Sequence, residues 1–168
     1  EKLGYAKYAY KNTILEEYAT DSMENVVFLI CRFYEVTGLY PSKITVIGFE
    51  FKRGRFLENH LTALNWSNSK YVGNSPDPKS LSAEERTRYF EDLNESEYKH
   101  AVRHFKSDWF GLHSPLADKR ATRNPHGNKH NYRTSNPGLG AFFAAMDAKM
   151  ANQEIRQVFS ETTRQKSL

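Results

Sequence analysis

Three observations predict an α/β fold with a mostly parallel sheet, of the Rossmann-like three-layer kind. Strand-like and helix-like segments alternate between residues 13 and 65, which is the order of a parallel βαβα unit. The segment ITVIGF at 44–49 is short and rich in β-branched residues, as expected of a strand that is buried on both faces. The length of 168 residues fits a single domain.

The βαβα core is predicted within residues 13–65. Residues 13–16 have the composition of a short strand, and a helix is expected over about 22–37. This helix has Asp21 or Ser22 as its cap, apolar residues at helical spacing, and Gly38 and Pro41 to end it. The strand at 44–49 and a helix over about 53–65, with His60 on its apolar face, complete the core.

The remaining residues are predicted as additions to this core. Residues 66–107 form an insertion with a weak strand near its start and polar helices over 82–106, which begin at a capping box at Ser82 and break near Asn94. Residues 108–150 form a basic segment with short helices over about 115–123 and 139–150. Residues 151–168 form a polar tail, which we expect to fray.

The number of strong strands is low for the predicted fold. A doubly wound sheet usually contains about five or six strands, whereas this sequence has two strong candidates. We therefore expect the fold to be incomplete in these 168 residues. A second chain, or an N-terminal half of the protein, is expected to supply the other strands.

Composition excludes several classes of protein. The sequence has no apolar run long enough to cross a bilayer, and its opening residues lack the apolar core of a secretory signal. A cytoplasmic protein with no membrane partner is therefore predicted. Cys31 is the single cysteine, which excludes an internal disulfide and a cysteine-rich zinc site, and its apolar surroundings predict a buried structural thiol.

The charges are distributed unevenly along the chain. Residues 1–100 carry 13 basic and 15 acidic side chains, whereas residues 101–168 carry 11 basic and 5 acidic ones. A basic C-terminal segment indicates contact with something anionic, which is either a ligand or the acidic half of this protein.

Polar side chains follow the two strands predicted in the core. In an open α/β sheet, ligands bind beyond the carboxyl ends of the strands, and parallel neighbouring strands bring these ends together. Helix N–H groups and nearby cations at this edge predict a site for a small anionic ligand. The candidate ligand-binding residues there are Glu17, Ser22, Asn25, Lys52 and Arg55, and the candidate catalytic residues, which would move a proton, are Asp21 and His60.

Each candidate also has a structural interpretation. Asp21 and Ser22 are typical helix caps, and Lys52 and Arg55 are able to pair with the neighbouring acids Glu50 and Glu58. A histidine on an apolar helix face, such as His60, is more often a hydrogen-bonded core residue than an acid–base group. Glu97, His100 and His104 share one helix face, but no fourth ligand is evident. We therefore predict no metal site.

The basic segment suggests a second function. Lys119, Arg120 and Arg123 precede a stretch in which Lys129 and Arg133 alternate with histidine and tyrosine rings. Such a pattern is able to follow a nucleic-acid backbone or an acidic partner. The alternative is that the segment folds back over the acidic first half. A third hypothesis is a non-catalytic structural subunit.

Two stretches of the sequence resemble the DUF218 domain family in its fungal form. The first covers residues 13–65, with an E-x-A-x-D-S-x-E-N block at 17–25 and P-x-x-I-T-V-x-G-F-E-F-K-x-x-R-F at 41–56. The second covers residues 108–146 and contains Leu-Ala-x-Lys-Arg and Arg-Asn-Pro within 116–125.

The resemblance implies a Rossmann-like fold and leaves the existence of a catalytic activity open. It implies S-adenosylmethionine or a nucleotide as the bound cofactor. Its acidic block corresponds here to Asp21, Ser22 and Asn25, and its basic block to Lys52, Arg55 and His60.

Overall fold

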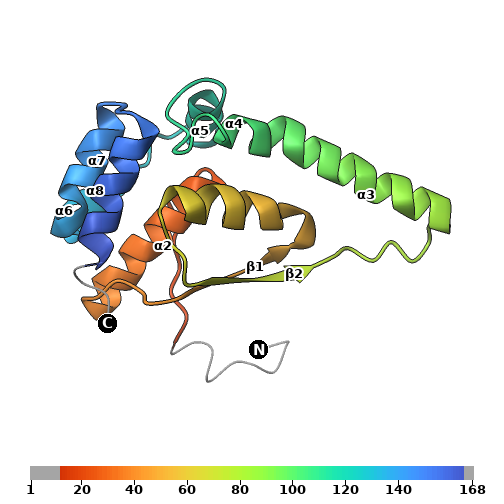
Figure 1. Cartoon of the computed structure of the whole chain (residues 1–168), viewed down its shortest axis with the longest axis horizontal. Coiled ribbons are helices and arrows are strands. Elements are labelled where there is room, and N and C mark those ends of the chain that lie inside the picture. Colours follow the sequence, from red (N-terminus) through yellow and green to blue (C-terminus); the bar gives the residue numbers. More distant parts are fainter. Residues whose placement is uncertain (1–11, 165–168) are drawn as a thin grey trace.

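The structure is a computed structural model that describes residues 12–164, and Figure 1 shows how its elements follow one another. Helical and strand segments alternate in the first half, and the second half is helical. The elements are α2 (Ser22–Thr37), β1 (Ile44–Phe49), η1 (Glu50–Lys52), η2 (Arg55–Leu61), β2 (Ser69–Asn74), α3 (Ala83–Glu97), η3 (Tyr98–Val102), α4 (Arg103–Phe105), α5 (Leu116–Arg123), α6 (Tyr132–Ser135), η4 (Pro137–Leu139), α7 (Gly140–Asp147) and α8 (Asn152–Arg164).

The sheet of the described residues consists of β1 and β2, which run parallel. Ile44 lies opposite Ser69, and Phe49 lies opposite Asn74. The helical segment around η2 connects the two strands, because parallel neighbours need a crossover. A mixed α/β fold with parallel pairing is therefore confirmed, in the form of a small two-stranded sheet.

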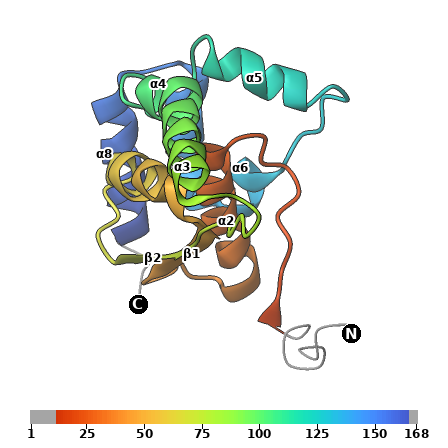
Figure 2. The ribbon, with the colours of Figure 1, turned by 90° about the vertical axis from the view of Figure 1, so that its right-hand side faces the viewer.

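The core lies on one side of this sheet, where the helices gather (Figures 1 and 2). The buried face of α2 packs with the end of the η2 segment and with the C-terminal helices. Cys31 is completely buried there, and burial raises the pKa of its thiol, as expected of a structural cysteine. The largest fully buried apolar side chains are Met23, Tyr40, Leu61, Leu64, Phe110, Leu139, Phe142, Ile155 and Phe159.

The prediction of a strand at 13–16 is wrong. Residues 13–20 have no regular secondary structure, and their polar groups bond to side chains rather than to a strand. The Leu15 carbonyl accepts from Arg32 Nε at 3.3 Å, and Tyr132 donates its hydroxyl to Glu16 at 2.9 Å. A strand forms only where a neighbouring backbone completes its hydrogen bonds, and here none of the described residues does so.

Two helix predictions also need correction. The helix from Ala83 is not broken near Asn94 but continues through η3 into α4. The Tyr98 amide bonds to the carbonyls of Asn94 and Glu95, so the backbone bonding is unbroken. The polar tail does not fray over 152–164 but forms α8, because Ile155, Phe159 and Thr163 recur every four residues and bury one face. Residues 165–168 lie outside the described part.

Candidate functional site

The N-terminus of α2 is capped by Asp21, as predicted. Asp21 Oδ1 accepts from the backbone N–H groups of Met23 at 2.9 Å and Glu24 at 2.8 Å. These groups would otherwise lack a partner at the start of the helix. The second oxygen, Oδ2, accepts from Arg120 Nε at 2.6 Å. The residue predicted as a proton-transfer group is thus a helix cap in an ion pair with the basic segment.

Arg120 joins three parts of the chain. Its Nη2 donates to the Phe110 carbonyl at 2.6 Å. Its Nε, which donates to Asp21, also lies 3.4 Å from Glu24 Oε1. Nearby, Arg123 Nη1 donates to the Thr20 carbonyl at 2.8 Å. The basic segment therefore folds back onto the acidic start of α2, which is the alternative arrangement foreseen for it.

Gly111 is required by this ion pair. Its φ is +67°, and a Cβ atom there would lie 2.7 Å from Arg120 Nη2 and 3.2 Å from Asp21 Oδ2. Gly111→Ala is expected to lower the free energy of unfolding by about 2–3 kcal/mol, because backbone strain and a steric clash add together. Gly127→Ala is the matched control, since Gly127 has φ +62° and open space around it. Chemical denaturation of both variants measures the difference, and equal losses would contradict this assignment.

The two predicted blocks meet at Ser22 and His60. Ser22 Oγ lies 2.7 Å from His60 Nε2, although 38 positions separate the residues. The imidazole is fully buried between the rings of Phe56 and Phe105. Burial, with the neighbouring charges of Arg55 and Arg120, lowers the pKa of His60 to about 3. This geometry favours a neutral core histidine over an acid–base catalyst.

Arg55 forms an ion pair that sequence reasoning missed. Its Nε lies 2.8 Å from Glu97 Oε1, and both side chains are largely buried. Desolvation raises the pKa of Glu97 and lowers the pKa of Arg55. The predicted partner Glu58 is not the one used, and Glu50 pairs with Arg53 instead. In the sequence, Glu97 shares a helix face with His100 and His104, and this spacing does not indicate a contact with Arg55.

The winding of the η2 segment accounts for where Arg55 and His60 lie. Arg55–Leu61 is a π-helix, in which residues five apart are about one turn apart. Arg55 and His60 therefore project from the same side of the segment, where Arg55 contacts Glu97 and His60 contacts Ser22. π-Helical turns are frequent at functional sites, which keeps this corner of the fold a candidate.

A cavity of about 530 Å³ lies between α2 and β1. Asn25 from α2 and Lys52, which follows β1, both line it. Lys52 Nζ lies 5.5 Å from the ring centres of Phe49 and Phe51. Among the ion pairs of residues 12–164, none includes Lys52. The other lining residues are Val26, Leu29, Ile30, Phe33, Pro41, Lys43, Ile44, Thr45, Val46, Ile47, Gly48, Phe49 and Phe56.

The other predicted ligand-binding residues lie elsewhere. Glu17 is exposed and does not line this cavity. Lys119 donates from Nζ to the His100 carbonyl at 2.7 Å. Arg120 lines a separate groove of about 900 Å³, together with Lys129, His130 and Arg133 but also the acids Glu24 and Asp147. The structure thus brings Asn25 and Lys52 together and uses Ser22, Arg55, Lys119, Arg120 and Arg123 in internal contacts.

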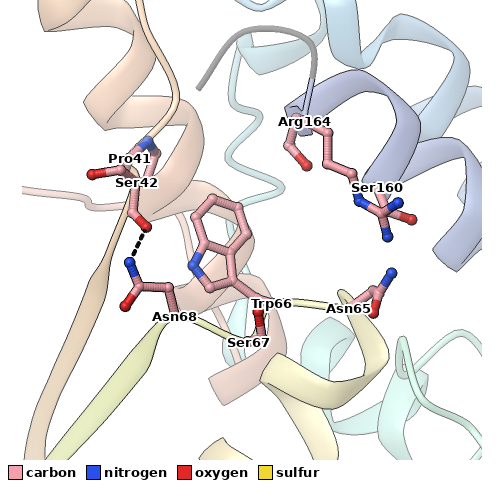
Figure 3. A pocket seen from close by; sticks show the side chains of 9 residues that line it. Pro41, Ser42, Asn65, Trp66, Ser67, Asn68, Ser160 and Arg164 are labelled. Carbon is pink, nitrogen blue, oxygen red and sulfur yellow. Dashed lines mark hydrogen bonds between the residues drawn. The ribbon is translucent and has the colours of Figure 1, made fainter. Parts of the chain in front are cut away.

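A third cavity, of about 300 Å³, contains none of the predicted residues (Figure 3). Trp66 and the amides of Asn65 and Asn68 lie on one side of it, and Ser160 and Arg164 lie on the other. Asn68 donates to the Ser42 carbonyl at 2.8 Å, so part of its polar lining is already bonded within the protein.

The described residues contain neither a candidate membrane span nor a candidate metal site. No helix within 12–164 combines the length and the apolar character that crossing a bilayer requires. In the same part of the chain, no three His, Cys, Asp or Glu side chains gather as metal ligands would. Glu97, one of the three residues weighed for a metal site, is paired with Arg55.

Comparison with known proteins finds a yeast relative. An uncharacterized protein of Saccharomyces cerevisiae is 39% identical over 112 residues, which are 66% of this chain. The matched part is 37% of the yeast protein, so the similarity spans well under half of that relative's length. No protein-family model matches the sequence, and no solved structure matches the fold.

Proposed function

We propose that this protein binds a small anionic, nucleotide-like ligand at the carboxyl end of β1. The observation that carries the proposal is the cavity between α2 and β1, where Asn25 and Lys52 come together. The carboxyl end of a parallel strand beside a helix N-terminus is where α/β folds bind ligands. The DUF218 resemblance and a Rossmann-like sheet, both expected from the sequence, are in keeping with this position.

The charges around the cavity support an anion. Among the described residues that line it are two lysines and no acidic side chain. The positive charge of Lys52 favours the ionised form of Glu97, but the Glu97 carboxylate is paired with Arg55. Lys52 is therefore available for a phosphate or carboxylate. A cationic sulfonium, as in S-adenosylmethionine, finds no carboxylate among these lining residues. A nucleotide therefore fits the charges better than S-adenosylmethionine does.

The apolar lining supports a ligand with a flat ring. Phe49 lines the cavity and is 46% exposed, and its ring stacks on Phe51 at 5.7 Å. An exposed aromatic face beside a lysine suits a base with an attached phosphate. The Asn25 side-chain amide, which is exposed on the first turn of α2, offers both a donor and an acceptor for ligand hydroxyls.

The proposal concerns binding and assigns no reaction. Asp21 is held by two backbone N–H groups and Arg120, and His60 is sealed from solvent. Neither predicted catalytic residue lines the cavity. The contacts of the basic segment weigh against nucleic-acid binding as the main function, because Lys119, Arg120 and Arg123 are used within the fold.

Lys52→Ala tests the site. Loss of a charge-assisted hydrogen bond of about 1.5–3 kcal/mol is expected to weaken binding of adenosine monophosphate roughly 10-fold to 100-fold. The thermal shift that the nucleotide produces in the parent protein should shrink accordingly. Lys43→Ala is the matched control, because Lys43 lines the same cavity beside the amino end of β1. A nucleotide shift that survives Lys52→Ala, or that Lys43→Ala abolishes equally, would rule out the proposed position.

A further inference from the structure

Within the described part of the chain, nothing pairs with the outer edge of β1. The Ile44 amide donates to the Asn68 carbonyl at 3.1 Å, on the side of β2. In a parallel ladder alternate residues face the same neighbour, so Val46 and Gly48 also point their backbone groups toward β2. The backbone groups of Thr45 and Ile47 point the other way. No strand among residues 12–164 lies on that side, and such an edge is a template for another strand.

The groove beside this edge is apolar along most of its length. Leu29 and Phe33, on the α2 face above the edge, are 45% and 43% exposed. Ile44 and Val46, the β1 side chains that pack against the core, line the same groove. Single exposed apolar residues are common, but a continuous apolar surface over one groove marks a place where another element packs.

The far face of the sheet is also exposed among residues 12–164. Side chains alternate along β1, and Thr45 and Ile47 are exposed on the face opposite Ile44 and Val46, which pack against the core. Val72 on β2 is exposed as well. Figures 1 and 2 place the strands at one border of the molecule, with the labelled helices predominantly on the other side. Parallel sheets are normally covered on both faces, and two parallel strands make a marginal sheet.

We infer that the β1 edge pairs with an additional parallel strand, supplied by polypeptide of the same protein outside these 168 residues. The matched part of the yeast relative is 37% of its length, so that relative has ample chain to provide strands. The new strand runs parallel to β1, as β2 does. A second copy fits less well, since a twofold axis at this edge would pair β1 with its own copy in antiparallel orientation, unlike the parallel pairing of β1 and β2.

This inference is compatible with the proposed ligand site and independent of it. The strand takes the length of the groove beside Leu29, Phe33 and Pro41, and the ligand takes the end beside Asn25 and Lys52. The carboxyl end of the added strand then borders the ligand. A failure of nucleotide binding leaves the strand inference intact, and the reverse also holds.

Amide hydrogen exchange tests the pairing in the protein expressed from its complete reading frame. The amides of Thr45 and Ile47 are expected to exchange within about tenfold of those of Val46 and Gly48, because all four then have ladder partners. The Val46 and Gly48 amides, which already face β2, are the internal controls. Exchange of Thr45 and Ile47 on the order of 100-fold faster than the controls would overturn the inference.

Thiol labelling provides a second readout. In the same protein, Phe33→Cys and Leu29→Cys are expected to react with a maleimide at least about tenfold more slowly than Tyr98→Cys, which lies on an exposed helical turn. Cys31 is buried and adds no background. Equal labelling of the three thiols in folded protein would overturn the inference. Protection that appears only under conditions where sedimentation shows a dimer would also overturn the inference, because the occupant of the groove would then be a second copy.

Discussion

Arg120→Ala is expected to lower the free energy of unfolding by about 3 kcal/mol. Removing one partner of a buried ion pair leaves the other charge without compensation, which typically costs about 3–5 kcal/mol. In Arg120→Ala the Asp21 carboxylate, which is 7% exposed, keeps only its hydrogen bonds to backbone N–H groups. The Phe110 carbonyl also loses the hydrogen bond that Arg120 donates to it. The variant therefore affects the start of α2 and the docking of the basic segment together.

Arg133→Ala is the matched control for this prediction. Arg133 pairs with Asp147, and both side chains are more than half exposed. Exposed pairs contribute at most about 1 kcal/mol. Urea denaturation of the two variants compares the pairs directly. If Arg120→Ala costs no more than Arg133→Ala, the ion pair with Asp21 does not anchor the segment.

The second large effect is a loss of stability in mild acid that depends on His60. The folded-state pKa of about 3 lies below the value of roughly 6.5 expected for an unfolded chain. Between these values the unfolded state binds a proton that the native state does not, so the free energy of unfolding falls as pH falls. The contribution of His60 is complete above about pH 6.5 and is smaller by about 2 kcal/mol at pH 5.

His60→Gln isolates this contribution, because glutamine keeps a polar group near Ser22 but does not titrate. The decrease in unfolding free energy from pH 7 to pH 5 should be about 2 kcal/mol smaller in His60→Gln than in the parent protein. His113→Gln is the control, since the His113 side chain is 60% exposed. A parent protein and a His60→Gln variant with the same pH dependence would show that His60 is solvated in solution.

Local signals were strong enough to predict the central elements. The cap, the apolar spacing and Gly38 define α2 at 22–37, and β-branched residues define β1 at 44–49, with the bounds that the structure has. Gly38 has φ +75° and ends α2, as predicted. These elements depend on residues that are neighbours in sequence, so a pattern along the chain is sufficient to find them.

The site could be predicted only in part, because it depends on contacts between distant segments. The blocks around residues 21–25 and 52–60 do meet, through Ser22 and His60, but most of their charged groups bind one another. Arg120 lies 99 positions from Asp21, and Glu97 comes from a helix predicted as polar. No local spacing encodes such partners, so the residues left for a ligand, Asn25 and Lys52, emerge only from the fold.

The most direct measurement for the proposed site is a nuclear magnetic resonance titration of the isotope-labelled protein with adenosine monophosphate. We expect saturable shift changes of the amides at Asn25, Gly48 and Lys52, which border the ligand end of the α2–β1 cavity. Shift changes confined to Lys119–Arg133, or no saturable change at the β1 end, would contradict the proposed site.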